Sequence, residues 1–109
     1  MTSFVARVKI MFILNPAFAE FIRAAVEDEN RARKLLTYDP SLLSLRTGRG
    51  ETALHHLAIM NYADAVQLLI ELGAEVNVSN QGGVHVLYEA IRAEAFETVI
   101  ILRRAGAVN

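Results

Sequence analysis

The sequence repeats itself with a period of 33 residues. Sliding the chain against itself by that distance pairs glycine with glycine and apolar residue with apolar residue in two successive units. The matched pairs are Gly50 and Gly83, Leu54 and Leu87, Val66 and Val99, Leu69 and Leu102, and Gly73 and Gly106. A constant period of this length is typical of stacked repeats, in which each unit buries its apolar side against its neighbours. The period therefore predicts a stacked-repeat solenoid.

Within each unit, two apolar helical patterns are separated by a short break. In the central unit, Val66 and Leu69 face inward while Gln67 and Glu71 face outward, as in an amphipathic helix. Gly73 follows as the expected left-handed glycine that ends this helix. No segment from residue 15 onward shows a convincing β pattern, so the predicted fold class is all-α. The predicted helices span residues 16–28, 31–38, a short stretch after Thr52, 63–72, 86–93 and 96–105.

Three polar residues are predicted to cap helices. Asn15 is an N-cap followed by Pro16, which is tolerated as the first helical residue because its missing N–H has no helical partner there. Asn30 is predicted to cap the second helix. Thr52 is predicted to cap the central unit, with His55 three residues on reaching back toward it.

The first fourteen residues are apolar, and their pattern fits a helix or a strand equally well. We expect this segment to cover the end of the first repeat. A cleaved signal over residues 1–19 is the alternative, but Asn15 and Pro16 interrupt its apolar run, which is shorter than signals normally have. The predicted location is therefore cytoplasmic, with export as the alternative.

Composition narrows the function classes. The 109 residues fit one domain, and a net charge of −1 without a basic stripe argues against a nucleic-acid partner. There is no cysteine, so disulfides and thiolate metal sites are excluded. No apolar run approaches the ~20 residues that span a membrane, so no membrane partner is expected. No metal or other cofactor is predicted, because the adjacent His55 and His56 face different ways on a helix.

The central unit resembles the ankyrin repeat, with departures at Ala53, Leu57 and Asn61. The matching residues are Gly50, Thr52, Leu54, His55, Ala58, Val66, Leu68, Leu69, Gly73, Ala74, Val76 and Asn77. The third unit is weaker because His85 and Tyr88 replace the threonine and histidine of the family pattern, and the first unit is degenerate. The resemblance implies an ankyrin-like solenoid over residues 15–109, with repeats at about 16–46, 47–79 and 80–109.

The resemblance also implies where a partner protein would bind: the concave side of the inner helices and the connector tips, defined here as residues 46–51 and 79–84. The candidate partner-binding residues are Arg46, Arg49, Glu51, His56, Ile59, Met60, Tyr62, Gln81, Val84 and Arg92. In an alternative that stays open, Ile59 and Met60 only pack on the neighbouring inner helix. Ile100 is a candidate end-face contact, because it replaces the outward Gln67 of the central unit.

The function predicted from these observations is non-catalytic: a small adaptor or inhibitor, of the kind that serves as an immunity-type antagonist, binding one protein partner. The rival is a self-associating subunit that forms a homo-oligomer through its end faces. An enzymatic interpretation would require a pocket uniting His56 or His85 with Glu89, and no catalytic motif supports it.

Overall fold

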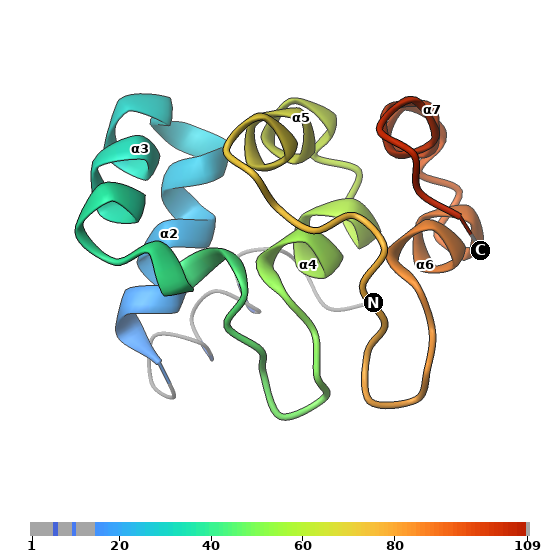
Figure 1. Ribbon diagram of the computed structural model, residues 1–109, viewed down its shortest axis with the longest axis horizontal. Coiled ribbons are helices and arrows are strands. Elements are labelled where there is room, and N and C mark those ends of the chain that lie inside the picture. Colours follow the sequence, from blue (N-terminus) through green and yellow to red (C-terminus); the bar gives the residue numbers. More distant parts are fainter. Residues whose placement is uncertain (1–5, 7–9, 11–14, 109) are drawn as a thin grey trace.

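The computed structural model describes residues 15–108 together with Ala6 and Ile10. The described residues form helix pairs stacked side by side (Figure 1). The elements are α2 (Pro16–Glu27), α3 (Glu29–Tyr38), the 3-10 helix η1 (Pro40–Leu43), α4 (Ala53–Ile59), α5 (Ala63–Glu71), α6 (Val86–Arg92) and α7 (Phe96–Arg104). The all-α solenoid is confirmed. Within this part of the chain, the β structure is an isolated bridge between Ser79 and His85. The predicted cover formed by residues 1–14 lies almost entirely outside the described residues.

The helices form two rows. In Figure 1, α2, α4 and α6 lie in one row and α3, α5 and α7 in the other, so that each pair packs against the next. The core lies between the rows and between neighbouring pairs, where Leu54, Leu57, Val66 and Leu69 of the central unit are at most 1% exposed. Burial of this apolar surface is the main favourable term in folding, and each pair depends on its neighbour for it.

The 33-residue period extends to the backbone itself. The residues with positive φ fall into pairs one period apart: Gly50 (74°) and Gly83 (77°), Asn61 (57°) and Glu94 (58°), Gly73 (104°) and Gly106 (92°). The predicted left-handed conformation of Gly73 is confirmed, and Asn61 adopts the same conformation at the break between α4 and α5. Glu94 adopts the same conformation although glutamate is not among the residues that favour it. The fold of the unit, rather than the local residue, therefore sets this turn.

Of the three predicted helix caps, Asn15 and Thr52 are found as N-caps and Asn30 is not. The side chain of Asn15 accepts a hydrogen bond from the Phe18 N–H (3.1 Å), and Pro16 is the first residue of α2, as predicted. Asn30 is not the cap of the second helix. Asp28 takes that role by accepting from the Arg31 N–H (3.2 Å), so α3 begins at Glu29. A carboxylate at this position also interacts favourably with the positive end of the helix, which explains the preference for Asp28.

The connector after α3 contains a short helix of its own. Asp39 is the C-cap of α3, and Pro40–Leu43 forms the 3-10 helix η1. The Asp39 carboxylate caps it by accepting from the Ser41 N–H (3.1 Å), and Leu42 is 2% exposed. This turn joins the degenerate first unit to the central one.

Polar side chains connect the central unit to the third. Asn61 Oδ1 accepts a hydrogen bond from the Thr98 hydroxyl (2.9 Å), which is fully buried. Asn77 donates to the Gly106 carbonyl (3.2 Å) and accepts from the Val108 N–H (2.9 Å). These bonds fix the register between units, which apolar packing alone specifies less strictly.

Candidate protein-binding site

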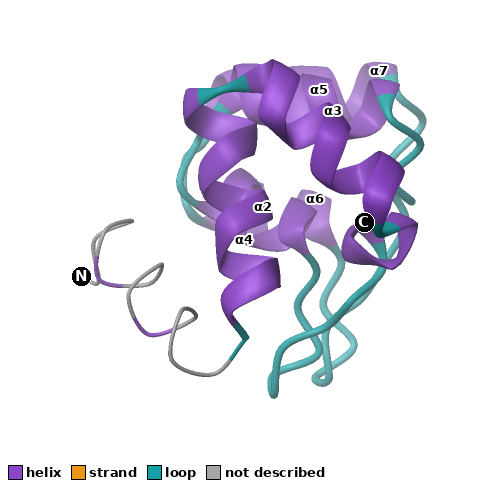
Figure 2. Ribbon diagram, turned by 90° about the vertical axis from the view of Figure 1, so that its left-hand side faces the viewer, coloured by secondary structure: helices purple, strands orange, loops and turns teal. Residues whose placement is uncertain are grey.

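The two connector tips project beyond the inner helices on the same side of the molecule (Figure 2). Each tip is closed by its own backbone. The Thr47 N–H donates to the Glu51 carbonyl (2.9 Å), and one period later the Asn80 N–H donates to the Val84 carbonyl (2.9 Å). Because these bonds satisfy backbone groups that would otherwise need water, each tip holds a defined shape.

The tips are also bonded to each other. The Gln81 N–H donates to the Arg49 carbonyl (2.9 Å). Arg46 reaches across the gap, with Nη1 donating to the carbonyls of Gly50 (2.7 Å) and Ser79 (2.6 Å). The two loops therefore act as one braced unit. Arg46 is a predicted partner-binding residue, but its Nη1 donates to both carbonyls of this brace.

An open hollow of about 370 Å³ lies at the braced tips. Its lining residues are Arg49, Asn80, Gln81, Gly82 and Val84. Asn80 Oδ1 fixes one wall by accepting from the N–H groups of Gly82 (2.9 Å) and Val84 (3.1 Å). Arg49 and Gln81 are exposed, and together they offer a cation and an amide to a carboxylate or a backbone carbonyl of a partner.

Two of the predicted partner-binding residues, one at a connector tip and one on the concave face, are buried. Glu51 and His56 are 7% and 6% exposed, with Glu51 Oε1 3.9 Å from His56 Nε2. The ring of His56 also meets that of Phe18 edge-on, at 6.2 Å between centroids. The prediction placed both side chains at the surface, but both are buried in the folded protein. The accessible site therefore excludes them.

The remaining predicted residues lie at the other ends of the inner helices. Ile59, Met60 and Tyr62 are half-buried where α4 ends, so part of each side chain is accessible. Arg92 occupies the last position of α6 and places its guanidinium 5.9 Å from the ring centroid of Tyr88. Tyr88 was not among the candidate residues, because its position in the repeat is filled by the buried His55 in the central unit. The predicted surface therefore has two parts: the braced tips and the far ends of α4 and α6.

His55 is a structural residue at the base of the tips. Its Nδ1 accepts from the Thr52 N–H (3.2 Å), which confirms the predicted capping box. A backbone N–H only donates, so Nδ1 must be unprotonated and the ring neutral. Burial lowers the pKa of His55 below its usual range, and an interaction with the Val84 backbone opposes this in part. In the third unit, His85 caps α6 without a side-chain bond.

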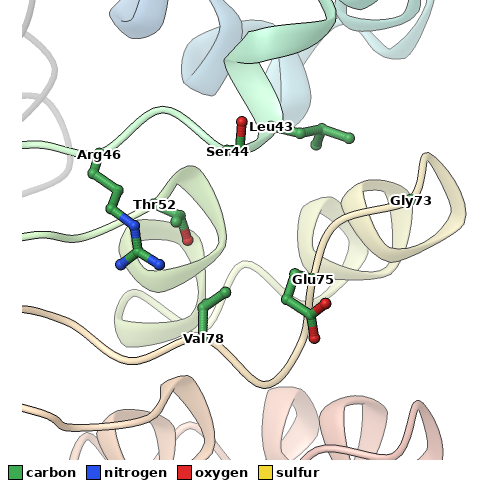
Figure 3. Close-up of a pocket in the computed structure, with 7 residues that line it drawn as sticks. All are labelled: Leu43, Ser44, Arg46, Thr52, Gly73, Glu75 and Val78. Atoms are coloured by element: carbon green, nitrogen blue, oxygen red, sulfur yellow. The ribbon is translucent and has the colours of Figure 1, made fainter.

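A second hollow, of about 340 Å³, lies where η1, α4 and the segment after α5 meet (Figure 3). Arg46 and Glu75 stand on opposite sides of it, and Leu43 and Val78 supply apolar wall. Neither hollow is lined by a histidine. Over residues 15–108, no three histidine or acidic side chains come together as a metal site would require. Glu89, which the enzymatic interpretation needed, accepts a hydrogen bond from the Asn80 side chain (3.3 Å).

Comparison with known proteins identifies the family. A family model described as ankyrin repeats in three copies matches residues 21–109. The chain belongs to the ankyrin repeat family. This family generally provides non-catalytic modules that bind other proteins. In the described residues, no helix has the length and apolar character needed to cross a membrane.

Curated relatives share this repeat region. The chain is 33% identical over 72 residues to the human BCL-6 corepressor-like protein 1, covering 66% of this chain and 4% of that protein. It is 40% identical over 76 residues to the Probable E3 ubiquitin-protein ligase XBOS33 of Oryza sativa subsp. japonica, covering 69% of this chain and 15% of that protein. The ankyrin repeat protein thus spans less than a fifth of these curated relatives.

A solved structure is similar in fold and in sequence. It is that of the predatory endopeptidase Bd0816 from Bdellovibrio bacteriovorus in complex with the immunity protein Bd3460. The matching chain superimposes with a TM-score of 0.70 at 30% identity, covering 77% of this ankyrin repeat protein and 44% of that chain.

Proposed function

We propose that this ankyrin repeat protein is a non-catalytic adaptor or inhibitor that binds one folded protein partner through its braced connector tips. The observation that carries the proposal is the pair of bonds between the tips: Arg46 to Ser79, and Gln81 to Arg49. A surface that is ordered before binding loses less conformational entropy when a partner arrives. The bracing therefore favours tight recognition of a rigid partner over loose contact with a flexible one.

The chemistry at the tips suggests which part of a partner would dock there. Arg49 and Gln81 border the open hollow beside the half-buried Val84. An acidic or carbonyl-rich edge of the partner would meet the guanidinium and the amide, and a small apolar group would meet Val84. The accessible parts of Ile59 and Met60 would then contact the same partner farther along the inner helices, because α4 starts at the tips and ends at Ile59.

The immunity-type refinement is supported by the similar structure, in which the neighbour is an immunity protein bound to an endopeptidase. An antagonist of this kind acts by occupying a surface of its target and needs no catalytic group of its own. We propose the same mode of action here, with the target unspecified.

Site-specific photocrosslinking tests the proposal. A photoreactive amino acid replaces Gln81 at the tips in one variant and Gln67, on the outward side of α5, in a matched control; both glutamines are exposed. In extract of the native host, we expect the Gln81 variant to give one discrete protein adduct and the Gln67 variant none. Addition of excess Arg49→Glu protein should leave that adduct intact, whereas excess unlabelled wild type should compete it away. Equal crosslinking at both positions would contradict a site at the tips.

A further inference from the structure

The outward side of α7 carries a row of exposed residues that includes two large apolar side chains. We name it the α7 ridge: Phe96, Glu97, Ile100, Arg103 and Arg104. Phe96 is 67% and Ile100 51% exposed, which is unusual for large apolar side chains. α7 lies at the end of the stack in Figure 1, so its outward side is unobstructed within the described part of the chain.

The central unit shows that this ridge is not required by the fold. One period earlier, Ala63 stands in place of Phe96 and is 9% exposed, and the exposed polar Gln67 stands in place of Ile100. Gln67 there bonds to Glu71 (3.3 Å). The helix pair thus forms with small or polar residues at these positions. Two large exposed apolar residues on α7 are therefore an addition that the repeat does not need for stability.

The ridge is self-complementary about Ile100. Glu97 lies three residues before Ile100 and Arg103 three residues after it, and Phe96 and Arg104 lie four residues before and after. Residues three and four apart share one side of a helix. If a second α7 packs antiparallel with its Ile100 opposite the first, each Glu97 faces an Arg103 and each Phe96 an Arg104. The first pair is an ion pair and the second a cation–π contact.

The charged members of the ridge are available for such contacts. The ion pairs within the described residues join Arg23 to Glu27, Arg31 to Glu20, and Arg33 to Glu29, and His56 pairs with Glu51 only when its ring is protonated. None of them uses Glu97, Arg103 or Arg104. On α5 the same symmetry fails, because Asp64 and Ile70 flank Gln67 and would pair an acid with an apolar residue.

We propose that the α7 ridge is a homodimer contact, in which two copies of the chain pair their α7 helices antiparallel about a two-fold axis at Ile100. Two-fold symmetric contacts of one patch with itself are the commonest arrangement among homo-oligomers. Because α7 spans nine residues, or about 14 Å at the rise of an α-helix, the interface is small. The dimer is accordingly weak and forms in a concentration-dependent way. It leaves the connector tips, which belong to other elements, open to a partner.

Sedimentation velocity of the purified chain over a range of roughly 1 to 500 µM, where weak protein pairs associate, measures the dimer. The expected result is a shift from the monomer mass of 12.1 kDa toward twice that value as concentration rises. Ile100→Glu should remove the shift, because it places two carboxylates at the two-fold axis. Gln67→Glu, at the equivalent exposed position of α5, should leave it unchanged. A monomer at every concentration would overturn the proposal.

Reversing the charge at Glu97 or at Arg103 distinguishes the antiparallel pairing of two α7 helices from any other use of the α7 ridge. Glu97→Arg and Arg103→Glu should each abolish self-association, because each places like charges opposite one another. Mixing the two variants should restore a dimer of one copy of each, since every pair in it is again of opposite sign. Circular dichroism of each variant should match that of the wild type, because all the exchanged side chains are exposed. If the mixture stays monomeric while the wild type dimerises, the antiparallel register is wrong.

The outcome is independent of the proposed function. Ile100→Glu should retain the adduct formed through residue 81, because the α7 ridge and the tips are separate surfaces. If Ile100→Glu abolished both the dimer and the adduct, the dimer would be the form that binds the partner. The claim that the α7 ridge and the tips are separate surfaces would then be overturned.

Discussion

Gly50 lies directly against the backbone of Gln81: a Cβ atom added to Gly50 would stand 2.7 Å from the Gln81 nitrogen. Real Cβ atoms do not approach another atom so closely. The connector tip formed by residues 46–51 therefore has glycine at position 50 for two reasons. One is the positive φ of 74°, and the other is the proximity of the next tip. Gly83, one period later, has a φ of 77°, but a Cβ atom added there would meet no other atom within 4 Å.

This difference yields the first prediction. Gly83→Ala should cost about 1–2 kcal/mol of unfolding free energy, the usual penalty for a side chain in the left-handed region. Gly50→Ala should cost about 1–3 kcal/mol more, because the backbone of the two tips must also move apart. Urea denaturation of both variants measures the difference. Equal losses would mean that the two tips are not in close contact.

The second prediction concerns the brace between the tips. Arg46→Met removes the two hydrogen bonds to the carbonyls of Gly50 and Ser79 while keeping a long side chain. We expect amide hydrogen exchange at Gln81 to accelerate about ten-fold, since bonds from a charged group are worth about 1.5–3 kcal/mol. Arg49→Met is the matched control from the same loop and should leave the exchange rate unchanged. Similar rates in both variants would contradict a bracing role for Arg46.

The third prediction is a pH dependence. Burial lowers the pKa of His55 in the folded protein. As the pH falls, the unfolded chain therefore binds a proton at this histidine at a higher pH than the folded protein does. Stability should therefore be highest above about pH 6.5 and fall as the pH decreases toward the folded-state pKa, by at most about 1.4 kcal/mol per pH unit. His55→Gln keeps a side chain that completes a capping box but cannot titrate. Its stability should fall less steeply over the same range when measured by denaturation at several pH values.

The fourth prediction concerns the register between units. Thr98→Val removes the buried hydroxyl that donates to Asn61 Oδ1 and should cost about 0.5–1.5 kcal/mol. Asn61→Gly keeps the left-handed turn and removes the acceptor. In the double variant the Thr98→Val cost should be clearly smaller, because its partner is already absent. Strictly additive losses in thermal or urea denaturation would show that this bond does not couple the two units.

Several features of the protein follow from the sequence alone. The period between Gly50 and Gly83 specified stacked units, and the glycine at 73 specified where a helix ends, because few other residues tolerate that backbone conformation. Asn15 and Pro16 specified the start of α2. Asp28 and Asn30, two residues apart, were both capable caps, and local chemistry ranked them too closely for the sequence to decide between them.

The tertiary structure decided which side chains a partner can reach. In the sequence, Glu51 and Arg49 look like equivalent charged tip residues, but in the folded protein Glu51 is buried and Arg49 is exposed. Arg46 was assigned to the partner surface, yet the carbonyl of Ser79, 33 residues away in sequence, is one of its partners. Accessibility and long-range hydrogen bonding depend on how units stack. The sequence of one repeat predicts its helices and turns, while its exposed surface is defined only once its neighbours are in place.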